Sequence, residues 1–250
     1  MNLSGSDSSK TSNFSETAKI ILQALLIALA IRTFLFQPFV IPSGSMKNTL
    51  LVGDYLFVSK YSYGYSRYSF PFGLAPFSGR IWGSKPERGD IAVFKRSTDA
   101  STDYIKRVIG LPGDTIQMVD GILHINGEAV ERERITDFID QGPFGNVRHV
   151  PRYRETLPNG VSYDTLDMTP VGQLDNTRRH VVPDGHYFMM GDNRDVSHDS
   201  RVFSDFGVIP LANFIGRAEV LFFSIDKDTP AWQVWTWPWT VKWNRIGKVL

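Results

Sequence analysis

Two serines separated by a single glycine are the first residues in this chain that could do chemistry. The run Pro42-Ser43-Gly44-Ser45-Met46 offers two hydroxyls, and glycine lets the backbone turn sharply between them. A serine becomes a nucleophile only when a base takes its proton. The chain has no cysteine, which excludes a thiol nucleophile, a zinc–thiolate site and disulfides, and its five histidines show no ligand spacing. A serine paired with an unusual base is the covalent chemistry that remains.

Lysine can serve as that base if it is kept neutral. Burial among apolar groups disfavours the ammonium and lowers its pKa by up to about 3–5 units. Lys106 lies in the run Tyr104–Ile109, which has the composition of a strand, and it shares a face with Tyr104 and Val108. A lysine at such a position is more often an edge or solvent residue. The pattern alone therefore leaves Lys106 open as either a base or an exposed side chain.

Other catalytic templates are missing from the sequence. It contains no Gly-x-Ser-x-Gly elbow, phosphate loop, His-Glu-x-x-His pair or EF-hand loop. Asp192, Asp195 and Asp199 could suggest a metal site, but Arg194 and Arg201 among them favour ion pairs and turn hydrogen bonds. We expect no metal and no organic cofactor. The net charge of +1 gives no support for nucleic-acid binding.

The N-terminal region predicts a membrane anchor. Residues 1–17 are polar and predict a flexible tail, and residues 18–38 predict a transmembrane helix that Pro38 ends. Arg32 near one end could extend its side chain to the headgroups. Two alternatives are a buried helix and a cleaved signal peptide, since Ala28-Leu29-Ala30 resembles a cleavage site.

Basic residues flanking the apolar stretch indicate its orientation. Lys10 and Lys19 precede it, and Lys47 is the only base soon after it. Loops on the cytoplasmic side carry the excess of Lys and Arg, so we expect a cytoplasmic N-terminus and a body outside the cytoplasm.

Beyond Pro42 the chain changes to short alternating segments separated by turns, which predicts a mainly β body. Asp120-Gly121 between two apolar runs predicts a hairpin with a type I′ turn. We expect a β core formed by residues 39–118 and 181–225. Residues 119–180 are expected to form an inserted, β-rich second subdomain.

Aromatic residues are clustered in two places. One cluster lies in a Ser-, Gly- and Pro-rich loop at residues 61–85, and the other is a Trp-rich tail at residues 226–250 that contains Trp232, Trp235, Trp237, Trp239 and Trp243. Tryptophan favours the membrane interface, where its ring and its N–H are both satisfied. Contact with the lipid bilayer and coverage of the β-core edge both remain open for these rings.

Four ordered blocks together resemble bacterial type I signal peptidase, also called leader peptidase. The blocks are residues 42–54, 88–95, 103–114 and 191–201, and the predicted anchor precedes them. The resemblance implies an antiparallel, barrel-like β body behind one transmembrane helix. It also implies a membrane-anchored serine endopeptidase that removes signal peptides from exported preproteins, cleaving after small residues in Ala-x-Ala-like sites.

The resemblance further implies a role for each matching residue. Ser45 matches the nucleophile and Lys106 the general base of a Ser–Lys dyad. Ser43 matches the hydroxyl that joins the Ser45 amide in the oxyanion hole. Ser197 matches a serine that hydrogen-bonds the lysine, and Asp199 and Arg201 match a supporting ion pair. Pockets for small substrate side chains are implied at Phe39, Ile41, Met46, Leu56, Val93, Tyr104 and Ile105.

The resemblance also implies a location and partners. It places the protein as a single-pass protein in the bacterial inner (cytoplasmic) membrane, with its body on the periplasmic side and close to the export translocon. Two departures from the family pattern stand near the site: Lys47-Asn48 occupies a place where many members have a proline, and Val196 replaces a common asparagine. The rival functions are another Ser–Lys protease of the self-cleaving repressor type and a non-enzymatic, membrane-anchored β-domain that binds a partner.

Overall fold

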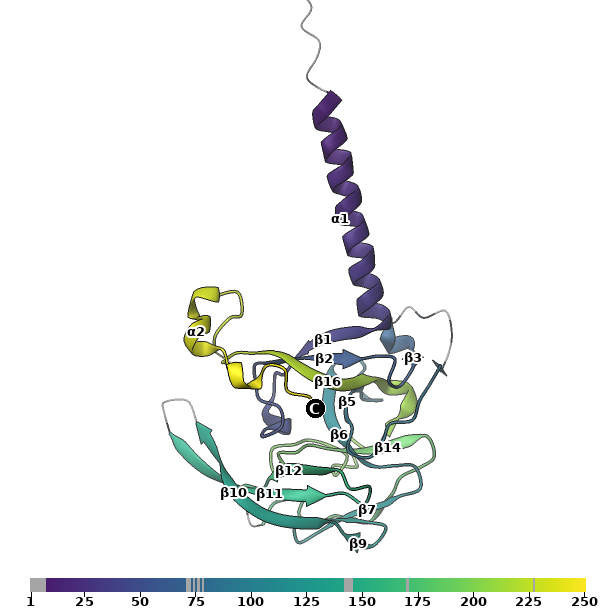
Figure 1. The fold of residues 1–250 in the computed structure, drawn as a ribbon. Coiled ribbons are helices and arrows are strands. Elements are labelled where there is room, and N and C mark those ends of the chain that lie inside the picture. The colour runs from purple at the N-terminus through teal and green to yellow at the C-terminus, as the bar shows by residue number, and fades with distance from the viewer. Residues whose placement is uncertain are drawn as a thin grey trace, which may run out of the picture.

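The computed structural model describes residues 8–70, 73, 75, 77, 79–141, 146–169, 171–226 and 228–250. One long helix, α1 (Ser8–Phe34), projects from a β body, and the two are seen from the side in Figure 1. The segment Phe14–Phe34 is long and apolar enough to cross a membrane, and none of it is buried against the body. The alternative of a buried helix is therefore wrong.

The helix begins earlier than the sequence indicated. Residues 8–17 are helical although we expected them in a flexible tail, and the first seven residues of that tail lie outside the described part of the chain. Extending an existing helix costs far less than nucleating one, so the apolar segment can continue into a polar sequence of weak propensity.

The helix also ends before Pro38, at Phe34. The Tyr65 hydroxyl donates a 2.7 Å hydrogen bond to the Phe34 carbonyl and so satisfies one of the last unpaired carbonyls of the helix. Pro38 instead lies inside strand β1 (Phe36–Val40), which is an edge strand, where a missing N–H is tolerated. The predicted end of the anchor at residue 38 is therefore corrected to Phe34.

A seven-stranded antiparallel sheet forms the part of the body next to the helix. Its strand order is β1-β2-β16-β5-β6-β14-β15. The remaining bounds are β2 (Asp54–Ser59), β5 (Ile91–Lys95), β6 (Asp103–Gly110), β14 (His186–Met190), β15 (Ile209–Pro210) and β16 (Phe214–Ser224). Two short strands, β3 (Tyr65–Ser66) and β4 (Arg80–Ile81), pair in the aromatic loop beside the helix base. The prediction of a mainly β, antiparallel body is confirmed.

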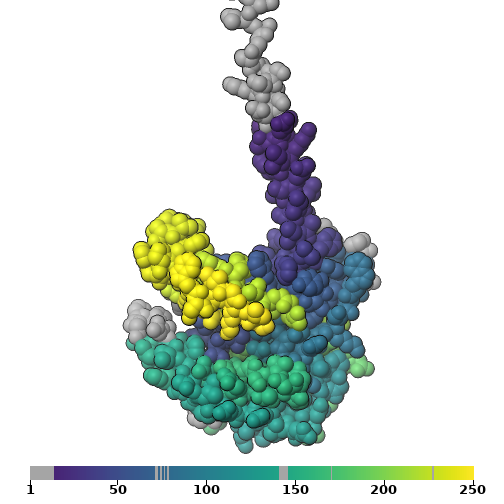
Figure 2. Space-filling view, in the orientation of Figure 1, coloured from purple at the N-terminus to yellow at the C-terminus, as the bar shows by residue number. Residues whose placement is uncertain are grey.

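The inserted region forms two further sheets on the side of the body away from the helix (Figures 1 and 2). One contains β7 (Thr115–Val119), β8 (Ile122–Ile125), β9 (Glu128–Ala129) and β13 (His180–Val181). The other contains β10 (Glu131–Gln141), β11 (Val147–Thr156) and β12 (Ser162–Leu166). Because β7 pairs with β8 and β13, it belongs with the insertion, so a boundary before Thr115 describes the pairing better than one after residue 118.

Two turns in the insertion have the conformation that their residues favour. Asp120 and Gly121 between β7 and β8 have φ values of 49° and 75°, and Asn126 and Gly127 between β8 and β9 have φ values of 57° and 89°. Two consecutive residues with positive φ are the requirement of a type I′ turn. The predicted hairpin at Asp120-Gly121 is confirmed.

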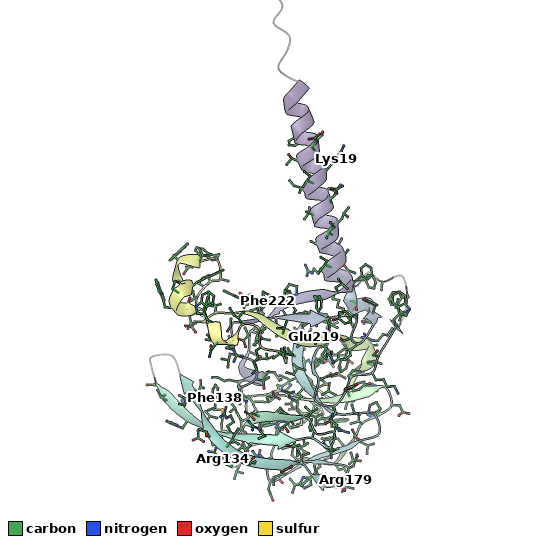
Figure 3. All side chains as sticks on the ribbon, in the orientation of Figure 1. Lys19, Arg134, Phe138, Arg179, Glu219 and Phe222 are labelled. Atoms are coloured by element: carbon green, nitrogen blue, oxygen red, sulfur yellow. The ribbon has the colours of Figure 1, made fainter. Side chains whose placement is uncertain are left out.

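Apolar side chains from the sheets form three clusters. One, which we call the groove cluster, contains Ile41, Met46, Leu56, Val93 and Ile215 among its buried members. A second, including Phe94, Tyr187 and Phe214, is extended by Tyr104, and a third joins β14 to the insertion. In Figure 3, Glu219 and Phe222 mark β16 below the helix base, and Arg134 and Phe138 mark the β10–β11 hairpin at the far side.

The C-terminal segment continues from β16 into the short helix α2 (Trp237–Thr240) and then returns to the sheet, where the Leu250 N–H donates to the Glu219 carbonyl of β16. In Figure 2 it lies on the same side of the body as the helix, above the insertion. Trp232, Trp235, Trp239 and Trp243 are exposed, whereas the ring of Trp237 packs 5.0 Å from that of Phe223. The tail thus covers part of the sheet with one ring and presents four others outward.

Candidate active site

A short turn places Ser45 against the lysine of β6. The turn is a 3₁₀ helix over Gly44–Met46, and the Ser45 Oγ lies 2.5 Å from the Lys106 Nζ. Both residues are buried, with exposed fractions of 8% for Ser45 and 4% for Lys106. The sequence places these residues 61 positions apart, and the sheet brings their reactive atoms into direct hydrogen-bond contact.

The surroundings of Lys106 favour its neutral form. Burial and, to a smaller extent, the positive charge of Arg201 lower the pKa of Lys106 to about 8. The carboxylates of Asp199 and Asp192 oppose this shift. A lysine with such a pKa has a substantial neutral fraction near pH 8, which an exposed lysine lacks. Of the two interpretations left open for Lys106, the structure supports the buried base.

The other residues of the serine run frame the approach to Ser45. Ser43 is exposed and has an extended backbone, and its Oγ lies 3.4 Å from the Ser45 Oγ. Gly44 has no positive φ, and a Cβ placed on it would meet no atom within 4 Å. We expected glycine to permit a sharp turn here, but the backbone at Gly44 is one that any residue can adopt. The open space beside Gly44 leaves room for another chain to approach.

The loop at residues 191–201 encloses the dyad from the other side. Asp199 and Arg201 form a buried ion pair at 2.9 Å, and Asp199 also accepts a hydrogen bond from the Gly191 N–H. No hydrogen bond joins the Ser197 hydroxyl to the described Lys106 Nζ, so the bond that the resemblance implied is not formed. The hydroxyl instead lies against Gly191, where a Cβ would come within 2.2 Å of Ser197 Oγ and 2.5 Å of the Ser45 carbonyl oxygen.

The sequence did not single out Asn193, which holds the serine turn. The Asn193 N–H donates to the Ser45 carbonyl (3.1 Å), and its side-chain amide donates to the Gly44 carbonyl (3.0 Å). These two bonds attach the 191–201 loop to the backbone on both sides of the nucleophile. The only signal for Asn193 in the sequence is its position inside one of the four blocks.

Asp192 connects the same loop to the strand of the lysine. Its carboxylate pairs with Arg107 (2.7 Å) and accepts a 2.5 Å hydrogen bond from the Thr49 hydroxyl. Arg107 is the neighbour of Lys106, and Thr49 follows the serine turn, so one buried carboxylate joins three segments of the site. The prediction that Asp192 serves an ion pair agrees with this contact.

Lys47 and Asn48, which stand where many family members have a proline, contact the insertion. Lys47 pairs with Asp140 of β10 at 2.5 Å, and Asn48 donates to the Asp164 carbonyl of β12. Asn48 has a φ of 87°, a conformation that asparagine tolerates. A proline, whose ring fixes φ near −65°, could not adopt it.

Six of the seven residues expected to form substrate pockets belong to the groove cluster. Ile41, Met46, Leu56 and Val93 are buried within it, and Phe39 and Ile105 pack against it with part of their surface exposed. Tyr104 lies in the neighbouring cluster, stacked on Phe94. Of the six expected residues in this cluster, Phe39 on β1 and Ile105 on β6 therefore contribute its accessible surface.

The first half of β6 has a free edge. Among the described residues, β14 pairs with Arg107, Val108 and Gly110, and no strand occupies that side of residues 103–106. An extended peptide can add to such an edge. The free segment is residues 103–106, because β14 already pairs with the rest of the strand.

Among the described residues, one group of three acids is close enough to share a cation. The carboxylate oxygens of Asp167, Asp175 and Asp195 lie within 4.8 Å of one another. Arg132 already pairs with Asp167, and Asp195 accepts hydrogen bonds from two backbone N–H groups. The three aspartates that suggested a metal site in the sequence do not form such a group among the described residues, and Asp192 and Asp199 pair with Arg107 and Arg201.

Comparison with known proteins identifies the family. The sequence model described as "Signal peptidase, peptidase S26" matches residues 14–223. A signal peptidase I of Rickettsia typhi is 44% identical over 80% of this chain and 76% of its own length. A signal peptidase I of Rickettsia canadensis is 46% identical over 79% of this chain and 76% of its own length. A solved signal peptidase I from Enterococcus faecalis is 26% identical and covers 54% of this chain and 97% of its own, with a TM-score of 0.32.

The family model covers most of the chain, from within α1 to the end of β16, and so includes the serine turn, the lysine strand and the 191–201 loop. The chain belongs to the signal peptidase family, peptidase S26.

Proposed function

We propose that this chain removes N-terminal signal peptides from preproteins, with Ser45 as the nucleophile and Lys106 as the general base. The observation that carries the proposal is the 2.5 Å contact between Ser45 Oγ and a buried Lys106 Nζ. Family membership supports the peptidase activity, and the lowered pKa of Lys106 supports its role as the base.

The reaction follows from this contact. Neutral Lys106 accepts the proton of Ser45 as the Ser45 Oγ attacks the scissile carbonyl. The Ser45 N–H and the Ser43 hydroxyl stabilise the oxyanion, and one such donor contributes about 3–4 kcal/mol. Lys106 then passes the proton to the leaving amine, which leaves an ester on Ser45. Water attacks that ester, giving its proton to Lys106, and the proton returns to Ser45 as the acid departs.

The substrate binds as an added strand in this proposal. The segment before the cut pairs with the free edge of residues 103–106, and its alternate side chains face the groove cluster. Because most members of that cluster are already buried, the space beside Phe39 and Ile105 suits small side chains. Cleavage after Ala-x-Ala-like sites follows.

The membrane arrangement forms a further part of the proposal. Helix α1 anchors the protein once in the cytoplasmic membrane, with its body on the periplasmic side and near the export translocon. The apolar, unburied segment Phe14–Phe34 supports the anchor, and Lys10 and Lys19 before it support the orientation. Anchoring holds the protease at the depth of its substrate and raises their effective concentration.

Two substitutions test the catalytic assignment. Ser45→Ala should reduce cleavage of a purified preprotein with an Ala-x-Ala site to background, and Lys106→Met should reduce it by about 10²–10⁴-fold or more. Lys85→Met changes an exposed lysine in the loop before β5 and should cleave like the parent.

Thermal unfolding of the same samples completes the test. All three variants should keep a cooperative transition close to that of the parent, so that lost activity reports chemistry and not unfolding. Cleavage at the parental rate by a folded Ser45→Ala or Lys106→Met variant would refute the dyad. If the folded parent itself never cleaved, the rival of a non-enzymatic β-domain would be favoured instead.

A further inference from the structure

A second cavity lies at the base of helix α1, apart from the Ser45–Lys106 contact. Its volume is about 370 Å³, within the range of small-ligand sites. Arg32 and Thr33 come from the last turn of the helix, Lys60 follows β2, Lys95 ends β5 and Asp103 begins β6. Gln37, Tyr68, Phe70, Gly73, Ala100 and Ile215 complete the lining.

The cavity has an excess of positive charge. Lys95 pairs with Asp103 at 2.8 Å, which neutralises one of the three cations. Arg32 and Lys60 form no ion pair with any other described residue. Lys60 is only 2% exposed, and its Nζ donates to the Ser69 carbonyl at 2.5 Å. A buried ammonium normally has an acidic partner, so this cavity offers two cationic groups to an anion.

The electrostatics of Lys60 agree with an unfilled anion site. Burial and the positive charge of Arg32 together lower the pKa of Lys60 to about 8, although the negative charge of Asp103 opposes the shift. An anion between the two side chains would offset both effects and would hold Lys60 in its charged form.

The position of the cavity indicates where such an anion comes from. The apolar segment Phe14–Phe34 ends at the cavity, so lipid headgroups lie at this level when the helix spans a membrane. Arginine binds phosphate oxygens through paired N–H donors, and lysine binds them as a point charge. The rings of Tyr68 and Phe70 and the side chain of Ile215 offer apolar surface to the glycerol and the upper acyl chain.

We propose that this cavity binds the phosphate group of an anionic phospholipid through Arg32 and Lys60. The site rests on the proposed membrane anchor but not on the proposed peptidase chemistry. Gln37 of the cavity lies two residues before Phe39 on β1. A bound lipid would therefore hold the start of the strand that carries Phe39 of the groove cluster.

The test measures lipid binding by the full chain in non-ionic detergent without substrate. Native mass spectrometry and thermal unfolding are followed while dioleoylphosphatidylglycerol, dioleoylphosphatidylcholine or inorganic phosphate is added. We expect the phosphatidylglycerol to bind at least tenfold more tightly than either of the other two and to raise the unfolding temperature. Equal binding of phosphatidylcholine, or equal stabilisation by inorganic phosphate, would overturn the proposal.

Charge-removing variants locate the site. Arg32→Gln and Lys60→Gln should each weaken phosphatidylglycerol binding about tenfold or more, and Lys85→Gln, an equal charge change outside the cavity, should not. Arg32 is exposed, so its variant tests the site even if the buried Lys60→Gln variant fails to fold. Parental binding by Arg32→Gln would refute the assignment.

A cleavage assay on the same samples separates the two proposals. A preparation that cleaves a preprotein but does not prefer phosphatidylglycerol contradicts only the lipid site. A preparation that prefers phosphatidylglycerol but never cleaves contradicts only the peptidase chemistry.

Discussion

Lys106 can act as a base only if its surroundings keep it neutral. Neighbouring carboxylates pull its pKa up, while burial and Arg201 pull it down, and burial prevails. Asp199 is itself neutralised by Arg201 at 2.9 Å, and Asp192 by Arg107 at 2.7 Å. The two ion pairs therefore leave the lysine desolvated without presenting it with a free carboxylate that would keep it protonated.

A pH profile of cleavage tests this balance. Lys106 acts only when it is unprotonated, so kcat/KM should rise with pH and level off above an apparent pKa of about 8. Initial rates on a preprotein at low substrate concentration, measured from pH 6 to 10, give the profile. If kcat/KM instead rose with an apparent pKa near the ordinary lysine value of about 10.4, the site would not desolvate the base.

Asn193 should act as a positioning residue for the nucleophile. Asn193→Ala removes the side-chain bond to the Gly44 carbonyl and loosens the turn that holds Ser45. We expect kcat to fall about 10-fold or more with KM nearly unchanged, because small misplacements of reacting groups are costly. Steady-state kinetics check this, and Asn193→Asp, which keeps the shape but not the donor, should fall equally. A purely structural role would lower the unfolding temperature and leave kcat of the folded enzyme intact.

The sequence alone predicted the kind of chemistry at the site but not the environment of each residue. The serine run and the absence of cysteine narrowed the chemistry to a serine with an unusual base, but burial of Lys106 depends on strands distant in sequence. Asn193 was missed because backbone-carbonyl contacts leave no pattern in the chain. The bond from Ser197 to Lys106 was expected from the resemblance and is not formed in this structure, where Lys106 Nζ contacts Ser45 instead.

Two elements, β1 and β6, carry the exposed part of the groove. Phe39 lies on the edge strand β1, and Ile105 lies on the half of β6 that has no second partner. A peptide strand can add to the free edge of β6. The side chains of Phe39 and Ile105 restrict the space next to that edge. Substrate size and backbone pairing are therefore set by the same two strands.

Shortening Ile105 should widen that space. With Ile105→Ala, preproteins that carry Val in place of Ala at the first or third position before the cut should be cleaved better relative to the Ala-x-Ala parent. Each methylene accommodated changes discrimination by about 10–200-fold. Competition between the two preproteins in one reaction gives the ratio of kcat/KM values. An unchanged ratio would place the size limit elsewhere in the groove cluster, and Val119→Ala on β7 serves as a matched control outside it.

The strands were predictable where local pattern and tertiary context agree. Alternating runs and the Asp120-Gly121 turn were identified correctly because side-chain spacing and positive φ are local properties. The ends of α1 were not, since one is set by cooperative extension of the helix and the other by a tyrosine hydroxyl from a distant loop. The transfer of β7 to the insertion depends on pairing with β8 and β13, which a strand pattern alone cannot reveal.

At the scale of the whole molecule, features suited to a membrane gather on one side. The helix and the C-terminal segment lie on the side of the body opposite the insertion (Figure 1). The last turn of that helix lines the cationic cavity, and the C-terminal segment carries the exposed tryptophans. The same segment reaches the active site, because Arg245 pairs with Asp54 at 2.5 Å and donates to the Thr49 carbonyl. Deleting the whole tail would therefore disturb the serine turn as well as any lipid contact.

Substituting only the exposed rings avoids that difficulty. Trp232, Trp235 and Trp239 are exposed and make no contact with Asp54 or Thr49, so replacing all three by Phe should leave Arg245 in place. In vesicles made with brominated phosphatidylcholine, tryptophan fluorescence of the full chain should be strongly quenched, because indole rings favour the interface. The triple variant should lose a large share of the quenchable signal, with Trp243 and Trp82 supplying the remainder, whereas Trp237→Phe, which removes the ring packed on Phe223, should lose little. If the triple variant and Trp237→Phe lose equal shares, the tail only covers the sheet and the membrane contact is refuted.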